Sequence, residues 1–275
     1  MIKNLVLNLS IGKDEDGARD YAISLAREFG AHLAAVAFAY EPIPATTLID
    51  DAPGEWFDEL REQAEKSANS AVERFNAAVR GSGILAEARA LTTTLTGAAD
   101  LFGRIARRFD LSLIQQAEPG KDSADPLVIE AALFDSGRPV LVVPYINQGG
   151  ARFDRILVCW DGSRGAARAI GDAMPFIERS KAVEIVIVGD RPKSREIPGA
   201  DIAQNLARHG AKAEVREIVA PDMDAGNVIL SHAADSSADL MVMGGYGHSR
   251  LREFVLGGVT RTILSSMTLP TLISH

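Results

Sequence analysis

A glycine-rich segment near residue 250 contains the residue types best suited to ligand chemistry. Gly244, Gly245 and Gly247 follow an apolar, strand-like run, and Gly257 and Gly258 precede a helix-like one. Glycine lets the backbone turn tightly and approach a ligand, and bare amides can form an anion-binding nest. The first amides of a helix also attract phosphate. The segment therefore predicts an anion site, and a plain strand-to-helix turn is the alternative.

Other side chains that could bind ligands are scattered. None of the five histidines has a partner at the i, i+4 spacing of a helical metal site, so we expect isolated surface or strand histidines. His248, Ser249 and Arg250 lie inside the glycine-rich segment and could touch a phosphate. Asp222 and Asp224 could hold Mg²⁺, although a helix cap with first-turn charge is the commoner use of such residues.

Cys159 is the single cysteine. An intramolecular disulfide and a cysteine-rich zinc site are therefore excluded. Cys159 falls in an apolar run, which favours a buried thiol over a nucleophile. The sequence has no Gly-x-Ser-x-Gly elbow, no His-Glu-x-x-His and no Walker loop, and we name no catalytic residues.

Strand-like and helix-like segments alternate along the whole chain. The strand-like segments are 5–9, 33–40, 86–91, 111–115 and 140–143, and then 156–159, 183–188, 213–219, 240–243 and 271–273. The helix-like segments are 16–29, 55–80, 98–109 and 126–134, and then 164–177, 199–209, 227–236 and 251–265. Parallel strands need crossover helices, so the order predicts an α/β fold with parallel sheets flanked by helices.

The second half repeats the order of the first. Residues 3–7 align with 154–158 at an offset of 151, and residues 110–111 align with 239–240 at an offset of 129. We infer an internal duplication, with a polar linker at 146–150. The predicted domains are 1–146 and 152–275, each a doubly wound, five-stranded parallel sheet flanked by helices.

The spacing of the glycines carries a more specific signal. Gly244-x-x-Gly247, followed after nine residues by Gly257, resembles the nucleotide loop of the universal stress protein family. The strand that ends before Asp161 resembles that family's first strand and its aspartate, and residues 269–273 are similar to its closing strand. The resemblance covers nearly all of the second half and extends to the first by topology.

The resemblance implies a fold like that of the adenine nucleotide alpha hydrolases and a site for ATP, with AMP or ADP as alternatives and Mg²⁺ as a companion ion. By position, Asp161 would meet the adenosine, and the backbone of Val188 would meet the base. Met243 and Gly244 would line the path of the sugar and phosphates. The phosphates would be held by backbone amides of Gly247, Gly257, Gly258 and Val259.

Two positions in the second half depart from the family pattern. Gly258 stands where the family usually has Ser or Thr, so a hydroxyl donor is lost while the amide remains. Trp160 stands where a smaller residue is common and could stack near the base or fill the pocket. We expect Gly247→Val to weaken nucleotide binding and Gly258→Ser to tighten it.

The first half departs further. Ser10 aligns with Asp161, and residues 115–122 replace the glycine loop. Glu118 and Asp122 in that stretch would repel phosphate at close range. We therefore expect the first half to have lost the nucleotide site.

Composition narrows the remaining function classes. The 275 residues carry a formal net charge of −8 and no long basic run, which disfavours general nucleic-acid binding. No apolar stretch approaches the length of a membrane helix, and the N-terminal residues do not resemble a secretory signal. A cytoplasmic location away from membranes is the resulting expectation.

The leading functional hypothesis is a stress-response regulator or interaction protein that responds to an adenine nucleotide, with unknown protein partners. The alternatives are a nucleotide-free scaffold and a slow ATPase, so turnover would at most be weak. Because the family often dimerises through its last strand, the resemblance also implies a pseudo-dimer within one chain that brings strands 140–143 and 271–273 together. A homodimer is the alternative assembly.

Overall fold

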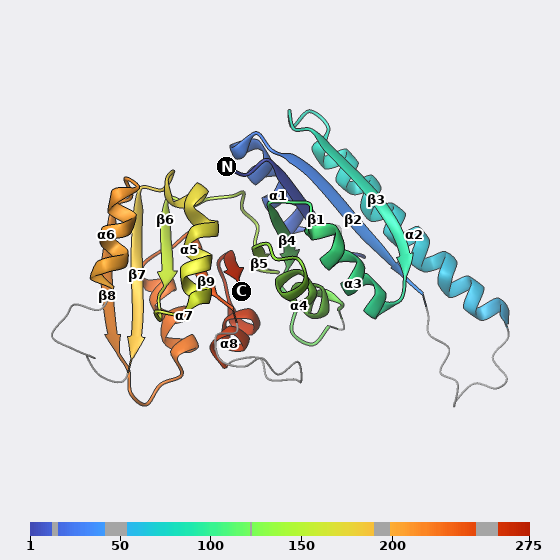
Figure 1. The fold of residues 1–275 in the computed structure, drawn as a ribbon. Helices are drawn as coiled ribbons and strands as arrows, with labels where there is room; N and C mark the ends of the chain where they lie inside the picture. The colour runs from blue at the N-terminus through green and yellow to red at the C-terminus, as the bar shows by residue number, and fades with distance from the viewer. Residues whose placement is uncertain (13–15, 42–53, 122, 190–198, 246–257) are drawn as a thin grey trace. The chain divides into compact units, whose positions relative to one another are not determined.

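The computed structural model describes residues 1–12, 16–41, 54–121, 123–189, 199–245 and 258–275 (Figure 1). Contacts within the chain divide it into two compact units. One comprises Ile2–Arg138 with Gln148–Ala151, and the other comprises Pro139–Asn147 and Arg152–His275 together with Met1. Among the described residues, no helix is both long and apolar enough to cross a membrane.

The first unit contains a parallel sheet with the order β3-β2-β1-β4. Its strands are β1 (Asn4–Asn8), β2 (His32–Tyr40), β3 (Ala86–Thr93) and β4 (Leu111–Gln115). Its helices are α1 (Gly17–Phe29), α2 (Gly54–Val79), α3 (Leu95–Ala106) and α4 (Asp125–Asp135). Every residue of β4 is buried, as expected for a strand covered by helices on both faces.

The second unit contains five parallel strands in the order β10-β9-β6-β7-β8. They are β6 (Arg155–Cys159), β7 (Ala182–Gly189), β8 (Ala213–Val219), β9 (Leu240–Gly244) and β10 (Thr271–Ser274). The helices are α5 (Arg164–Ile177), α6 (Ala200–Arg208), α7 (Ala225–Asp235) and α8 (Gly258–Ser266). The predicted α/β class, with a mainly parallel sheet flanked by helices, is confirmed.

Strand β5 (Val140–Val143) belongs to the second unit by its contacts. It pairs antiparallel with β10, with Val142 opposite Thr271 and Val140 opposite Ile273. The expectation that these two segments lie together is confirmed. The contacts group β5 with the second half although it precedes the linker in sequence, and the domain limits 1–146 and 152–275 stay predictions.

Local sequence explains where the helices begin and end. Asp16 caps α1 by accepting a hydrogen bond from the amide of Arg19, and Gly30 ends this helix at φ 58°, a left-handed conformation that favours glycine. Ser163 and Asp224 cap α5 and α7 in the same way as Asp16. The described part of α8 begins at Gly258, and the predicted start of that helix at residue 251 lies outside the described residues.

Candidate functional site

The candidate site lies at the carboxyl ends of the strands in the second unit. Strand β6 pairs with β7 on one side and with β9 on the other, so the strand order reverses beside β6. Open α/β sheets bind ligands outside the carboxyl ends of the strands at such a switch point. The segments that leave these strand ends contain the residues predicted from sequence.

Asp161 lies in the tight turn between β6 and α5. Its Oδ1 accepts a hydrogen bond of 2.9 Å from the amide of Ser163, and Gly162 between them has φ 77°. Ser163 in turn caps α5, because its Oγ accepts a 3.1 Å hydrogen bond from the amide of Ala166. The Asp161 side chain is exposed at the strand end, where its second carboxylate oxygen could accept a hydrogen bond from a ligand hydroxyl.

Gly244 ends β9 directly against the first turn of α5. A Cβ at this position would lie 2.5 Å from the amide nitrogen of Ala166 and 2.6 Å from the carbonyl carbon of Gly165. Both of these atoms are backbone, so no side chain can fit without moving the helix. Gly165 meets Gly244 from the other side, since a Cβ on Gly165 would lie 3.6 Å from the Gly244 Cα. Two backbones therefore meet at this point, which leaves the strand end free of side-chain bulk.

The other predicted residues fall into three groups. Val188 is half-buried near the end of β7, opposite Ile218 of β8, so its backbone lies at the strand-end edge. The Met243 side chain is buried, and only its backbone could contact a ligand. Gly258 is the exposed first residue of α8, followed by the half-buried Val259.

Gly247 and Gly257 lie outside the described residues, as do His248, Ser249 and Arg250. The described residues on either side of that stretch make contacts with neighbouring elements. The amide of Gly245 donates a 2.8 Å hydrogen bond to the carbonyl of Ser274. At the other end, α8 packs on α7 where a Cβ on Gly226 would lie 2.7 Å from the Cβ of Thr262.

One neighbour of the glycine segment was missed in the sequence. His275 Nδ1 lies 3.1 Å from the carbonyl oxygen of Gly245, so the imidazole stands beside the end of β9. The two residues are 30 positions apart, and no spacing rule connects them. Strand pairing between β9 and β10 brings them together.

Two acid–base groups lie at this edge. Cys159, which the sequence predicted to be buried, is half-buried as a residue, although its surroundings shield the thiol. Burial and the nearby Asp161 carboxylate raise the pKa of the Cys159 thiol to about 12, so this thiol stays protonated at neutral pH and is a poor nucleophile. Asp224 accepts a hydrogen bond from the amide of Asn227 as the cap of α7. In the part of the chain that the structure describes, no group of three His, Cys, Asp or Glu side chains could hold a metal ion.

The equivalent edge of the first unit is filled by side chains. Ser10, which aligns with Asp161, donates a 3.0 Å hydrogen bond from Oγ to Oε1 of Gln115. Gln115 and Gln116 align with Gly244 and Gly245, and both glutamine side chains are buried. Glutamine side chains therefore occupy this edge in the first unit, whereas in the second unit the glycine backbone packs against α5.

The acidic residues of the first half also remain near this edge. Asn8 Nδ2 donates a 3.2 Å hydrogen bond to Asp125 Oδ1, and burial together with the Asp125 carboxylate raises the pKa of Tyr40. Glu118 forms a 2.8 Å ion pair with Lys121, which offsets part of the predicted repulsion of phosphate. Asp122 lies outside the described residues.

Comparison with known proteins identifies the second half. Residues 152–275 match the model of the universal stress protein family. These residues, somewhat less than half of the chain, are therefore similar to the universal stress protein family. A curated universal stress protein of Synechocystis sp. is 29% identical over 142 residues, which are 49% of this chain and 46% of that protein. The chain therefore matches about half the length of this relative.

Solved structures extend the likeness of fold to nearly the whole chain. A universal stress protein from Archaeoglobus fulgidus has a TM-score of 0.71 and 16% identity, and the match covers 98% of this chain and 95% of that one. A putative universal stress protein from Pseudomonas aeruginosa has a TM-score of 0.64 and 14% identity, with coverage of 99% and 93%. At these identities the two structures support the fold alone.

Proposed function

We propose that the second half of this chain, which resembles the universal stress protein family, binds an adenine nucleotide, ATP or its products, at the carboxyl ends of β6, β7 and β9. Binding would change the conformation or the interactions of the protein in a stress response. Asp161 would accept a hydrogen bond from the ribose, the backbone of Val188 would contact the base, and the glycine backbone with the α8 amides would hold the phosphates.

The contrast at Gly244 is the observation that supports this proposal most directly. In the second half, the end of β9 can lie against α5 only because residue 244 has no side chain. In the first half, the aligned Gln115 is buried and bonded to Ser10. One half thus has a strand end free of side chains beside an exposed carboxylate, and the other half has buried glutamine side chains there.

The first experiment is mass spectrometry of small molecules released from freshly purified protein, followed by calorimetry with ATP, ADP and AMP. We expect one nucleotide per chain. A stoichiometry near two would contradict the loss of the site in the first half. Absence of binding at millimolar nucleotide would leave the scaffold hypothesis, and phosphate release above background would favour the slow ATPase.

A matched pair of variants locates the site. Asp161→Asn keeps an acceptor for the amide of Ser163 but removes the charge, and we expect about tenfold weaker binding. Ser10→Ala changes the aligned residue of the first half and should leave the affinity unchanged. Equal effects of the two substitutions would contradict the assignment of the site to the second half.

A further inference from the structure

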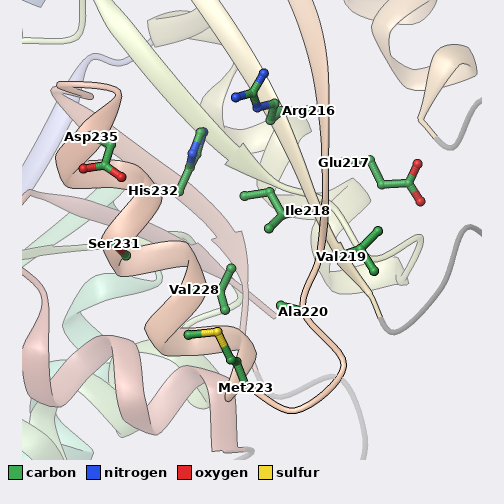
Figure 2. Close-up of a pocket in the computed structure, with 10 residues that line it drawn as sticks. All are labelled: Arg216, Glu217, Ile218, Val219, Ala220, Met223, Val228, Ser231, His232 and Asp235. Carbon is green, nitrogen blue, oxygen red and sulfur yellow. The ribbon is translucent and has the colours of Figure 1, made fainter.

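A second candidate site lies away from the strand ends, in a groove between β8 and α7 (Figure 2). The groove has a volume of about 540 Å³, which lies within the range of small-molecule sites. Its apolar part is lined by Ile218 of β8, Val228 of α7 and Met223 from the connection between them. Its polar part is lined by residues of both walls, which differ in charge.

Arg216 lines the groove from β8, and Asp235 lines it from α7. Figure 2 shows Arg216 and Ile218 extending toward α7, whereas Glu217 points to the other side of the strand. Both charged side chains are exposed, and among the described residues no ion pair joins Arg216 to Asp235. Arg216 and Asp235 therefore place opposite charges on the two walls without direct contact, and Glu217 adds a carboxylate to the β8 wall.

His232 stands between these charges on α7. Its Nε2 lies 3.0 Å from Oε1 of Glu184 on β7, and the two side chains are 16% and 20% exposed. A polar pair this far inside a helix–sheet interface costs desolvation energy that an apolar pair would not. The His232–Glu184 pair is therefore not explained by packing energy alone.

In the first half, an apolar side chain stands at the position that corresponds to His232. Thr94 and Asp224 are the caps of α3 and α7, and the eighth residue after each cap is Phe102 and His232 respectively. Phe102 is fully buried and packs edge-on against Phe38, with ring centroids 6.5 Å apart.

The following turn of the helix shows the same difference. The eleventh residue after the cap is the buried Ile105 in α3 and the exposed Asp235 in α7. On the sheet, Leu33 pairs with the first residue of β3, and Val183 pairs with the first residue of β8. The next residue is Ala34 in the first half and Glu184 in the second, so these two positions correspond.

The groove beside α3 measures about 290 Å³. Charged residues, namely Glu87, Arg89 and Arg108, line that groove as well. The groove of the second half is therefore wider, and its helical wall carries His232 and Asp235 where α3 has Phe102 and Ile105.

We propose that this groove binds a small zwitterion with an apolar side chain, namely a free apolar α-amino acid such as leucine. The Arg216 guanidinium pairs with the ligand carboxylate, for which its planar donors are suited. The Asp235 carboxylate pairs with the ligand ammonium group. The ligand side chain lies along Ile218, Val228 and Met223, so each part of the ligand meets a wall of matching chemistry.

Calorimetry on the full chain with L-leucine, N-acetyl-leucine and leucinamide tests the proposal. N-acetyl-leucine lacks the ammonium group, and leucinamide lacks the carboxylate. We expect saturable binding of leucine and binding at least about tenfold weaker for each derivative. Absence of saturable leucine binding at millimolar concentrations, or equal binding of all three compounds, overturns the proposal.

Variants place the binding in the groove. Arg216→Gln and Asp235→Asn change exposed side chains and should weaken leucine binding about tenfold or more. Glu214→Gln, which changes an exposed charge of β8 outside the groove, and Arg89→Gln, the aligned change in β3, are the matched controls and should not alter it. Leucine binding that is unchanged in Arg216→Gln and Asp235→Asn overturns the assignment. Nucleotide affinity is measured separately, because a change in it neither supports nor contradicts leucine binding in the groove.

Discussion

Gly258 allows a direct test of whether α8 contributes to nucleotide binding. It is the exposed first described residue of α8, and a Cβ placed there would meet no described atom within 4 Å. Its φ lies outside the left-handed region, so any residue can adopt this backbone. Gly258→Ser adds a hydroxyl beside the first amides of α8, and Gly258→Ala adds the same Cβ without it.

The expected magnitudes separate stability from binding. Glycine within a helix costs roughly 0.5–1 kcal/mol relative to alanine, so both variants should be equally or slightly more stable than the parent protein. A hydroxyl that donates to a phosphate oxygen should give a net gain of about 1 kcal/mol in binding. That gain corresponds to about fivefold higher affinity for Gly258→Ser and no comparable gain for Gly258→Ala.

Calorimetry with ATP on the parent and both variants measures the affinities, and thermal unfolding without nucleotide measures the stabilities. The hydroxyl effect is the difference between the serine and alanine variants. If these two variants bind ATP equally well, the α8 amides do not lie at the phosphates. If neither differs from a parent protein that fails to bind ATP, the strand end is a turn and the nucleotide proposal is wrong.

Three further predictions concern the buried groups of the site and its counterpart. Gly244→Ala should lower the free energy of unfolding by about 1–3 kcal/mol, because its Cβ would meet the backbone of Ala166 at 2.5 Å; unchanged denaturant unfolding would refute this. Burial raises the pKa of Asp16 above 3.8 in the folded state, so the wild type should gain stability relative to Asp16→Asn as the pH falls from 7 toward 4, and lose it as the pH rises through this window. Urea unfolding at several pH values tests the sign, and a constant difference would contradict it. Cys159, with its thiol pKa raised to about 12, should react with iodoacetamide at pH 8 on the order of a thousandfold more slowly in the folded protein than after unfolding, and comparable rates would show that the thiol is not buried.

Local signals in the sequence predicted most elements of both units. Apolar periodicity and caps such as Asp16 and Gly30 act over a few residues, so they can be read along the chain. The predicted strands at 111–115, 140–143 and 213–219 coincide with β4, β5 and β8. The alternation of strand and helix then required parallel pairing, since each parallel connection needs a crossover.

The candidate site was predicted in part. Asp161, Val188 and Gly244 lie at strand ends, and Gly258 is the first described residue of α8, while their role as a nucleotide site stays a prediction. The sequence suggested that Gly244 is small for the sake of a ligand, whereas the structure gives a further reason, because α5 lies against it. Such a contact joins residues nearly 80 positions apart and follows from packing rather than from spacing.

Sequence alone thus predicted the order of elements and the mainly parallel sheet, whereas the duplication and the loss of the nucleotide site from the first half stay predictions. The tertiary structure decided the antiparallel pairing of β5 with β10, the Ser10–Gln115 hydrogen bond and the His232–Glu184 pair. Periodicity and capping depend on neighbours within one or two turns, so they are written in the local sequence. Strand register and helix–sheet contacts depend on the combined burial of distant segments, so those pairs are set only when the whole sheet has formed.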